Sequence, residues 1–381
     1  MSSAPHADGT RDARGTGTPP ATGRTGRREH AARVAALRAA YRQELAEGTG
    51  AFFEARQHRC PWCGSARLGG RLRTTDLLQH KPGEFSLDRC HDCGHIFQNP
   101  RLSPRGLAFY YRDFYDGLGE QRLGGVFAGR TASYRARAAS VRPHLAGRPA
   151  EWLDVGTGHG HFCASAAEVL PEVVFDGLDR SDGAELAERA GRVRHGHRGT
   201  FTALAERMPA AYEVVSMFHY LEHSTDPQDE LEAAHAVLRP GGLLVIDVPD
   251  PESRWAQLLG RWWLPWLQPQ HLHLAPVANL RRRLTGTGFT VLAQEHVQAH
   301  DAVDLVAATW LALDALAPRE DLPWLPEPPG AVSRVLRGTT LLAGVPLLLA
   351  ATLLDRAVAG PLAGRWGLTN AYRLVARREA D

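Results

Sequence analysis

Between residues 151 and 298 the chain alternates short apolar runs with stretches of helical periodicity. Strands that alternate with helices indicate βαβ units and a mostly parallel sheet, so the predicted fold class is α/β with helices on both faces of the sheet. In such a fold the loop after the first strand carries the ligand. The predicted strands are 152–155, 173–179, 192–196, 212–218, 243–248 and 289–294, and helices are predicted at 161–170, 182–190, 228–238 and 277–286.

Two segments of different character begin the chain. Residues 1–29 contain almost no large apolar side chain, so they cannot offset the entropy of ordering and are predicted to form a disordered tail. Residues 30–50 are predicted to form a helix, because Val34, Leu37 and Tyr41 recur three or four positions apart with arginines between them.

A cysteine-containing module lies between these segments and the alternating core. It covers residues 51–104 and contains two strand-like runs, at 85–89 and 95–98. Residues 105–150 have helical periodicity and are predicted to connect the module to the core at 151–298.

The C-terminal part contains an unusually apolar segment. Residues 338–354 are 17 in a row without a charge, interrupted by Pro346. This segment is long enough for a buried helix, and it lies at the lower limit for a membrane helix, so a buried helix and an interfacial or re-entrant membrane helix remain open. Residues 371–377 again have the pattern of a strand.

The charge balance argues against a polyanionic partner. The chain has 44 basic and 42 acidic residues and a formal charge of +2, whereas neutralising phosphates requires a clear excess of basic residues. Apolar residues make up 44% of the chain, which is enough for a full core plus an accessory module. We therefore expect no nucleic-acid partner, unless a local basic patch provides one.

Four of the five cysteines form two similar CxxC pairs, each followed by a glycine. No apolar stretch near the N-terminus resembles a secretory signal, so we expect a cytoplasmic protein whose CxxC pairs bind metal, with redox activity as the alternative. Four thiolates in a tetrahedral arrangement suit zinc, and a site filled by four protein ligands is structural. The predicted zinc ligands are Cys60, Cys63, Cys90 and Cys93.

The loop after the first predicted strand has glycine at every second position: Gly156, Gly158 and Gly160. Glycine lets the backbone approach a ligand closely, and the helix that follows offers free N–H groups. A dinucleotide fingerprint would require glycine at the position of His161, so this loop is poorly suited to a pyrophosphate. Asp179 ends the second strand, where a carboxylate can accept hydrogen bonds from both ribose hydroxyls of an adenosyl group.

These features occur in the order found in class I S-adenosylmethionine-dependent methyltransferases, together with the segment 218–223 and the Pro-Gly-Gly turn within 238–242. Residues 151–298 resemble that family, and in particular the bacterial group that includes ubiquinone-biosynthesis O-methyltransferases. The cysteine module resembles the zinc-binding domain, a zinc ribbon, that is often fused to such enzymes, including some sugar methyltransferases. The resemblance implies a Rossmann-like sheet of seven strands and S-adenosylmethionine as the cofactor.

The resemblance also implies roles for individual residues. The three glycines of the loop would shape the pocket for the methionine part of the cofactor. Asp154 would anchor the loop and the cofactor's amino group, and Asp179 would bind the ribose. The backbone around Phe218 and His219 would form the floor of the pocket.

Methyl transfer from a sulfonium requires an aligned nucleophile and, for many acceptors, a general base. Histidine is the natural base near neutral pH, and both His219 and His223 follow the fourth strand. The family's active-site segment includes the position of His223, which makes it the first candidate base; capping of the next helix is the alternative. His271 lies in a stretch that recurs in the family and is the third candidate.

Four tryptophans lie between residues 255 and 266, after the fifth strand. In this fold the connection after the fifth strand covers the mouth of the substrate pocket, so these side chains are predicted either to form an aromatic lid or to pack against the cysteine module or the tail.

The resemblance further predicts a seventh strand that runs antiparallel between the fifth and the sixth. Residues 371–378 suit it, which makes residues 299–370 a helical, apolar insertion within the last hairpin. If residues 338–354 touch a membrane, the protein would be a peripheral membrane protein of the cytoplasm.

Together these patterns favour S-adenosylmethionine-dependent methyl transfer to a small molecule, a sugar or a glycan intermediate, with O-methylation ahead of C- or N-methylation. Two alternatives remain open: a methyltransferase whose zinc ribbon binds or helps to modify RNA, and a catalytically silent scaffold that binds the cofactor.

Overall fold

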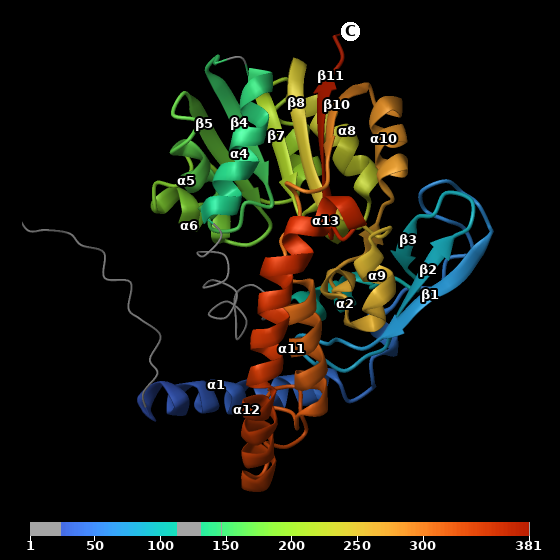
Figure 1. The fold of residues 1–381 in the computed structure, drawn as a ribbon, viewed down its shortest axis with the longest axis vertical. Coiled ribbons are helices and arrows are strands. Elements are labelled where there is room, and N and C mark those ends of the chain that lie inside the picture. Colours follow the sequence, from blue (N-terminus) through green and yellow to red (C-terminus); the bar gives the residue numbers. More distant parts are fainter. Residues whose placement is uncertain (1–23, 113–130, 146, 381) are drawn as a thin grey trace, which may run out of the picture. The chain divides into compact units, whose positions relative to one another are not determined.

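The computed structural model describes residues 24–112, 131–145 and 147–380, and it divides into two compact units. One unit consists of the chain up to Ala46 together with Asp321–Pro328. The other comprises Glu47–Glu320 and Pro329–Asp381 and contains both sheets. Figure 1 shows the elements that form them.

The smaller unit is built on helix α1, Arg24–Glu44. Tyr41 is buried and meets the ring of Trp324 edge-on, with 5.5 Å between the ring centroids. The helix begins at Arg24, so the prediction of disorder for residues 24–29 is wrong; three of these six residues are arginine, which favours helix. Residues 1–23 lie outside the described residues.

The larger unit contains a seven-stranded sheet in the order β10-β11-β8-β7-β4-β5-β6. All neighbouring pairs are parallel except those of β11, which runs antiparallel between β8 and β10, as predicted. The bounds are β4 Ala150–Val155, β5 Val173–Asp179, β6 Gly196–Arg198, β7 Tyr212–Phe218, β8 Leu238–Pro249, β10 Phe289–Glu295 and β11 Ala371–Arg378.

The third predicted strand is placed too early in the sequence. Val193 is apolar and buried, but it fills the core from the turn that precedes β6. Arg194 in the same turn binds the Asp176 carboxylate, with Nη2 2.6 Å from Oδ2. The ladder with β5 therefore begins only at Gly196.

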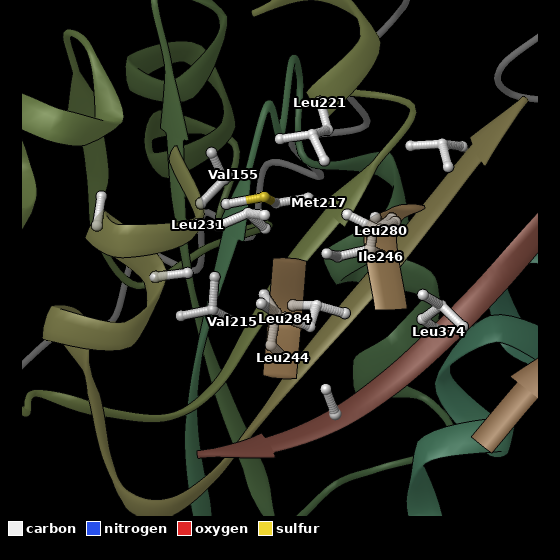
Figure 2. Packing of buried hydrophobic residues seen from close by; sticks show 14 of the residues in the cluster. Val155, Val215, Met217, Leu221, Leu231, Leu244, Ile246, Leu280, Leu284 and Leu374 are labelled. Carbon is white, nitrogen blue, oxygen red and sulfur yellow. The ribbon is translucent and has the colours of Figure 1, made fainter. Parts of the chain in front are cut away.

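Helices cover both faces of this sheet, which confirms the predicted fold class. Alternate residues of each strand point to opposite faces, so the core has two layers. Val215, Met217 and Ile246 pack against the layer that includes α8 and α10, seen from close by in Figure 2. The opposite layer contains α4, α5 and α6. The helix bounds are α4 Thr131–Leu145, α5 His161–Ala167, α6 Gly183–Arg189, α7 Phe201–Ala205, α8 Pro227–Val237 and α10 Val277–Gly286.

Strand β11 is held by a buried cluster of charges. Its Arg373 lies opposite Asp247 of β8 and donates to both carboxylate oxygens, at 2.6 and 2.8 Å. Arg137 of α4 approaches the same carboxylate at 3.1 Å. All three side chains are at most 5% exposed, so the cluster joins two strands and a helix inside the core.

A second, four-stranded sheet has the order β1-β2-β3-β9. The strands are β1 Leu68–Thr74, β2 Phe85–Cys90, β3 Ile96–Gln98 and β9 His273–Leu274. The runs predicted at 85–89 and 95–98 correspond to β2 and β3. Strand β1 was missed because its two glycines weaken the apolar alternation, and β9 is too short to be recognised from a pattern. Because β9 comes from the methyltransferase-like part of the chain, this sheet attaches the cysteine module to the core.

The remaining elements connect and extend these sheets. The predicted connector contains α2 and α4, and residues 113–130 between them lie outside the described residues. The insertion is helical, and its longest helix continues through Pro346. These elements are α2 Pro104–Tyr111, α9 Arg254–Leu258, α11 Asp304–Leu316, α12 Ala331–Leu354, a π-helical turn Asp355–Ala359, α13 Gly360–Trp366, and the 3-10 turns Gly50–Phe52, Leu221–His223, Gly260–Trp262 and Leu264–Trp266.

The charge cluster gives a test of the fold. Replacement of Asp247 by alanine leaves two guanidinium groups buried without their shared carboxylate, so the free energy of unfolding should fall by about 3–5 kcal/mol. Urea denaturation measures this change. The control is Glu168→Gln, which breaks the exposed pair with Arg135 and should cost less than about 1 kcal/mol. An equal loss of unfolding free energy in both variants would show that the charge cluster does not stabilise the position of β11.

Candidate functional site

The loop between β4 and α5 has the backbone that its sequence predicts. Gly156, Gly158 and Gly160 all have positive φ, at +79°, +52° and +71°. A Cβ atom on Gly156 would lie 2.8 Å from the ring of Tyr220, whereas one on Gly158 would meet no atom within 4 Å. The space beside Gly158 is therefore open, and a ligand can approach the backbone there.

Asp179 lies at the end of β5, next to this loop. Its Oδ2 accepts the N–H of Gly158 at 3.0 Å, and its Oδ1 accepts both the N–H and the hydroxyl of Ser181 at 2.8 Å. The side chain is partly exposed at the edge of the sheet. A carboxylate in this place has remaining lone pairs for hydroxyl groups of a ligand.

Asp154 lies beneath the loop and is only 4% exposed. It accepts the hydroxyl of Ser216 at 2.5 Å, and the Cys163 thiol lies 3.7 Å from its other oxygen. Burial raises the pKa of the Asp154 carboxyl to about 6, against the hydrogen bonds that lower it. These contacts connect β4, β7 and α5, so Asp154 supports the loop from inside. Cys163 is itself fully buried.

The end of β7 brings Phe218 and His219 to the same edge of the sheet. The ring of Phe218 meets that of Phe162 at 4.6 Å between centroids, and Phe218 itself is partly exposed. His219 has a positive φ of +51°, and its N–H donates to the Asp247 carbonyl at 2.9 Å. A non-glycine residue in the left-handed region is held there by its surroundings, and such residues are frequent at functional sites. The chain turns sharply here, and Tyr220 then packs against Gly156.

Three histidines surround Glu222 immediately beyond this turn. The Nδ1 of His219 lies 3.2 Å from Oε1 of Glu222, and the Nε2 of His271 lies 4.0 Å from the same oxygen. His223 and His271 meet edge-on with 4.6 Å between ring centroids. The sequence predicts these histidines as candidate bases and gives no catalytic role to Glu222, whose buried carboxylate is their common neighbour.

Backbone carbonyls fix the tautomers of two of these rings. The Nδ1 of His271 lies 2.7 Å from the Pro265 oxygen, and the Nδ1 of His223 lies 3.1 Å from the Gln270 oxygen. Because a carbonyl only accepts, both Nδ1 atoms carry the proton and both Nε2 atoms keep a lone pair.

The protonation states of this cluster follow from burial and from the hydrogen bond to His219. Burial lowers the pKa of His271 to about 3 and also lowers that of His223. Burial alone would raise the pKa of Glu222, but the hydrogen bond from His219 outweighs it and the pKa is about 2. Near neutral pH the Glu222 carboxylate thus lies beside the neutral imidazoles of His223 and His271.

Glu222, His223 and His271 also have the donor set of a divalent-cation site. One ligand atom from each lies within 4.8 Å of the other two. Oε2 of Glu222 is buried and has no hydrogen-bond partner among the described residues. The cluster can accordingly accept a proton from a substrate or bind a divalent cation.

The four cysteines of the N-terminal module converge as their spacing predicts. The Sγ atoms of Cys60 and Cys93 are 3.7 Å apart, and those of Cys63 and Cys90 are 3.6 Å apart. A tetrahedral zinc site with Zn–S bonds of about 2.3 Å places sulfur atoms about 3.8 Å apart, whereas a disulfide bond is about 2.05 Å long.

The two CxxC turns have the same conformation. Gly64 and Gly94 have φ of +76° and +75°, and each N–H donates to the carbonyl of the first cysteine of its pair at 2.9 Å. Burial raises the pKa of the Cys90 thiol, but the N–H groups of Cys93 and Asp92 outweigh it and bring the pKa to about 7. Such a thiol readily provides a thiolate for a metal.

The tryptophan-rich segment after β8 packs inward. Trp255, Trp263 and Trp266 are at most 6% exposed and share a cluster with Leu87 and Ile96 of the small sheet. This position agrees with packing against the cysteine module. The segment that follows runs on to His271 and β9, so it connects the module to the histidine cluster.

Comparison with known proteins finds a matching protein family. Residues 130–294 match the model of a family described as a methyltransferase domain. Ubiquinone biosynthesis O-methyltransferase from Azotobacter vinelandii is 29% identical over 128 residues, which is 32% of this chain and 54% of that protein. The same enzyme from Pseudomonas putida is 30% identical over 139 residues, covering 35% of this chain and 58% of that protein.

The chain thus spans little more than half the length of these curated relatives. Among solved structures, 1,6-didemethyltoxoflavin-N1-methyltransferase from Burkholderia thailandensis is 17% identical, with a TM-score of 0.42 over 78% of this chain and 96% of that one. Residues 130–294, which include the glycine loop and the acid that ends β5, are thus similar to a methyltransferase domain. The similarity to the O-methyltransferase relatives agrees with this match.

Proposed function

We propose that the protein transfers a methyl group from S-adenosylmethionine to a hydroxyl group of a small molecule, a sugar or a glycan intermediate in the cytoplasm. The observation that carries this proposal is the common position of the glycine loop, Asp179 and the cluster around Glu222 at one edge of the sheet. The O-methyltransferase relatives favour oxygen as the accepting atom.

The residues around the glycine loop fit the cofactor. Gly158 leaves open space beside its backbone, and Asp179 presents a partly exposed carboxylate next to it. When bound, S-adenosylmethionine supplies a methyl group that its sulfonium has already activated. Asp179 would accept hydrogen bonds from the ribose, while Asp154 would hold the loop from below without reaching the ligand.

Within the histidine cluster, the geometry favours His219 as the general base over His223. His219 is partly exposed at the end of β7, and Glu222 accepts the hydrogen bond of its Nδ1, which leaves Nε2 free to take a proton from the acceptor. His271 is buried and His223 is partly buried; His271 lies 4.0 Å from the Glu222 carboxylate and His223 packs against His271, so both would position that carboxylate. A carboxylate behind a histidine orients the ring and stabilises the imidazolium that forms.

We further propose that Cys60, Cys63, Cys90 and Cys93 bind one structural zinc ion. The sulfur distances and the two glycine turns support this assignment, and all four ligand positions come from the protein. Zinc would stabilise the small sheet, whose strand β9 directly follows His271 in the chain.

Removal of the carboxylate at residue 179 should weaken cofactor binding. Asp179→Ala loses charge-assisted hydrogen bonds of about 1.5–3 kcal/mol, so the Kd for S-adenosylmethionine should rise about 10- to 100-fold in titration calorimetry. Asp182→Ala is the matched control, because this exposed acid lies in the next turn and should leave the Kd unchanged. A wild-type protein that binds no S-adenosylmethionine would end the proposal.

Substitution of the two candidate bases separates their roles. His219→Asn should lower kcat by about 10²- to 10⁴-fold with an unchanged cofactor Kd, because it removes the proton acceptor but little volume. His223→Asn should lower kcat less. Radiolabelled methyl transfer to a panel of hydroxylated aromatic and sugar acceptors measures both. A larger loss of kcat in His223→Asn than in His219→Asn would identify His223 as the general base instead.

Metal analysis tests the cysteine site. Purified protein should contain about one zinc per chain, and Cys90→Ser should lower both the zinc content and the Tm, by about 2–3 °C or more if the lost metal contributes about 2 kcal/mol or more. Cys163→Ala is the control, since this thiol is remote in sequence from both CxxC pairs and should leave zinc at the wild-type level. Wild-type protein that is free of zinc after expression in zinc-supplemented medium would contradict the assignment.

A further inference from the structure

Helix α12 presents a wide apolar surface that nothing in the described chain covers. Ala331–Trp366 is the one described helical segment long and apolar enough to cross a membrane, and only 17% of its most apolar window is buried. The exposed side chains include Val335, Leu342, Leu347, Leu349, Leu353 and Leu354, each between 51% and 73% exposed. Soluble monomers rarely leave so many neighbouring leucines in water, so this surface has an occupant.

The opposite side of α12 is fixed to α11. A Cβ on Gly344 would lie 2.4 Å from Leu313, so the two helices are in close contact at this point. Asp355, at the end of α12, accepts the N–H groups of Leu305 and Val306 at 3.1 and 2.8 Å. Arg337, near its start, binds Asp314 at 2.5 Å. The two helices form a hairpin tied at both ends, and its outer face stays apolar.

The exposed charges beside this face have one sign. Between residues 329 and 370 the exposed charged side chains are Arg334, Arg356 and Arg365; Arg337 is 15% exposed and bound to Asp314, and the only acidic residue, Asp355, is buried. Trp366, half exposed, follows Arg365 at the end of α13. Arginines around an apolar surface, with tryptophan at its border, suit anionic lipid headgroups above acyl chains.

Although Ala331–Trp366 is long enough to cross a membrane, the connections of the hairpin favour a position on the membrane surface. Residues 338–354 would reach about 26 Å as a helix, short of the roughly 30 Å hydrocarbon core. Both ends of the insertion return to neighbouring strands, since Glu295 of β10 pairs with Arg373 of β11. The loop between the two helices carries charged residues, among them Glu320 and Asp321, which a crossing would have to move through the membrane.

We propose that the outer face of α12 binds the surface of an anionic phospholipid bilayer, with the helix lying in the plane of the interface. The apolar side chains enter the boundary of headgroups and acyl chains, and the arginines bind the phosphates. The methyltransferase domain is thereby held at the membrane surface on the side from which the hairpin enters.

Vesicle flotation tests this proposal without cofactor or acceptor, so its result is independent of the proposed methyl transfer. The full chain should float with vesicles of 70% phosphatidylcholine and 30% phosphatidylglycerol, and less with phosphatidylcholine alone. The variant Leu342→Ser/Leu349→Ser/Leu353→Ser should bind at least tenfold more weakly with little change in Tm, because each of these side chains is at least 61% exposed and has little packing to lose. The control Leu186→Ser/Leu258→Ser, which removes exposed leucines outside the hairpin, should bind like the wild type.

Two outcomes would overturn the proposal. Equal binding by the triple variant, or no wild-type binding to either vesicle, would remove the lipid surface as the partner. A wild-type dimer in light scattering that the triple variant dissociates, without vesicle binding, would assign the face to a second copy of the chain.

The orientation has its own test. The variant Glu327→Cys places a cysteine in the loop between α11 and α12. This cysteine should react with an impermeant maleimide added outside sealed vesicles, and peptide mass spectrometry measures the modification. Protection of this cysteine would indicate that the hairpin crosses the bilayer.

Discussion

The buried carboxylate of Asp247 is the interaction on which most of this structure depends. Its side chain binds Arg373 and Arg137, and its carbonyl accepts the N–H of His219. One residue of β8 therefore fixes the antiparallel last strand, the first helix of the domain and the sharp turn after β7. Charges in a nearly water-free core are stable only with complete partners, so these three elements must be in place together. The direction in which His219 leaves the sheet is a consequence of how the sheet is closed.

The cysteine module is joined to the site by a short, fully connected segment. The N–H of Gln98 donates to the Leu272 carbonyl, and the N–H of Leu272 donates to the Glu222 carbonyl, at 2.9 and 2.8 Å. His95 of the module also lies 3.1 Å from His273. The segment that carries His271 is thus held between the module and the turn of Glu222. The module therefore supports the segment around Glu222 and His271 through backbone hydrogen bonds.

The features that sequence reasoning found are those that a single residue type requires. Three glycines with positive φ, two CxxC pairs and a carboxylate at the end of β5 each have few alternatives at their positions. The central position of Glu222 could not be predicted because it comes from three histidines that fold around it, one of them 49 positions later in the chain. Strand β9 was missed because two residues carry no periodicity, and its partner β3 is far away in the sequence. The exposure of α12 could not be predicted either, because an apolar sequence of this kind occurs both in buried helices and in helices with an exposed apolar face.

The helical insertion is tolerated because its ends are fixed by the sheet itself. Loop-closure entropy grows only slowly with length, by about 0.6 kcal/mol for each doubling, so a long insertion costs little more than a short hairpin loop. Strands β10 and β11 pair from Phe289 to Glu295, and β8 binds β11 on its other side. The insertion can therefore change its surface without disturbing the sheet, while the Asp355 and Asp314 contacts keep its two helices together. An apolar face on such a hairpin does not compete with the core for burial, which allows it to remain exposed until a partner covers it.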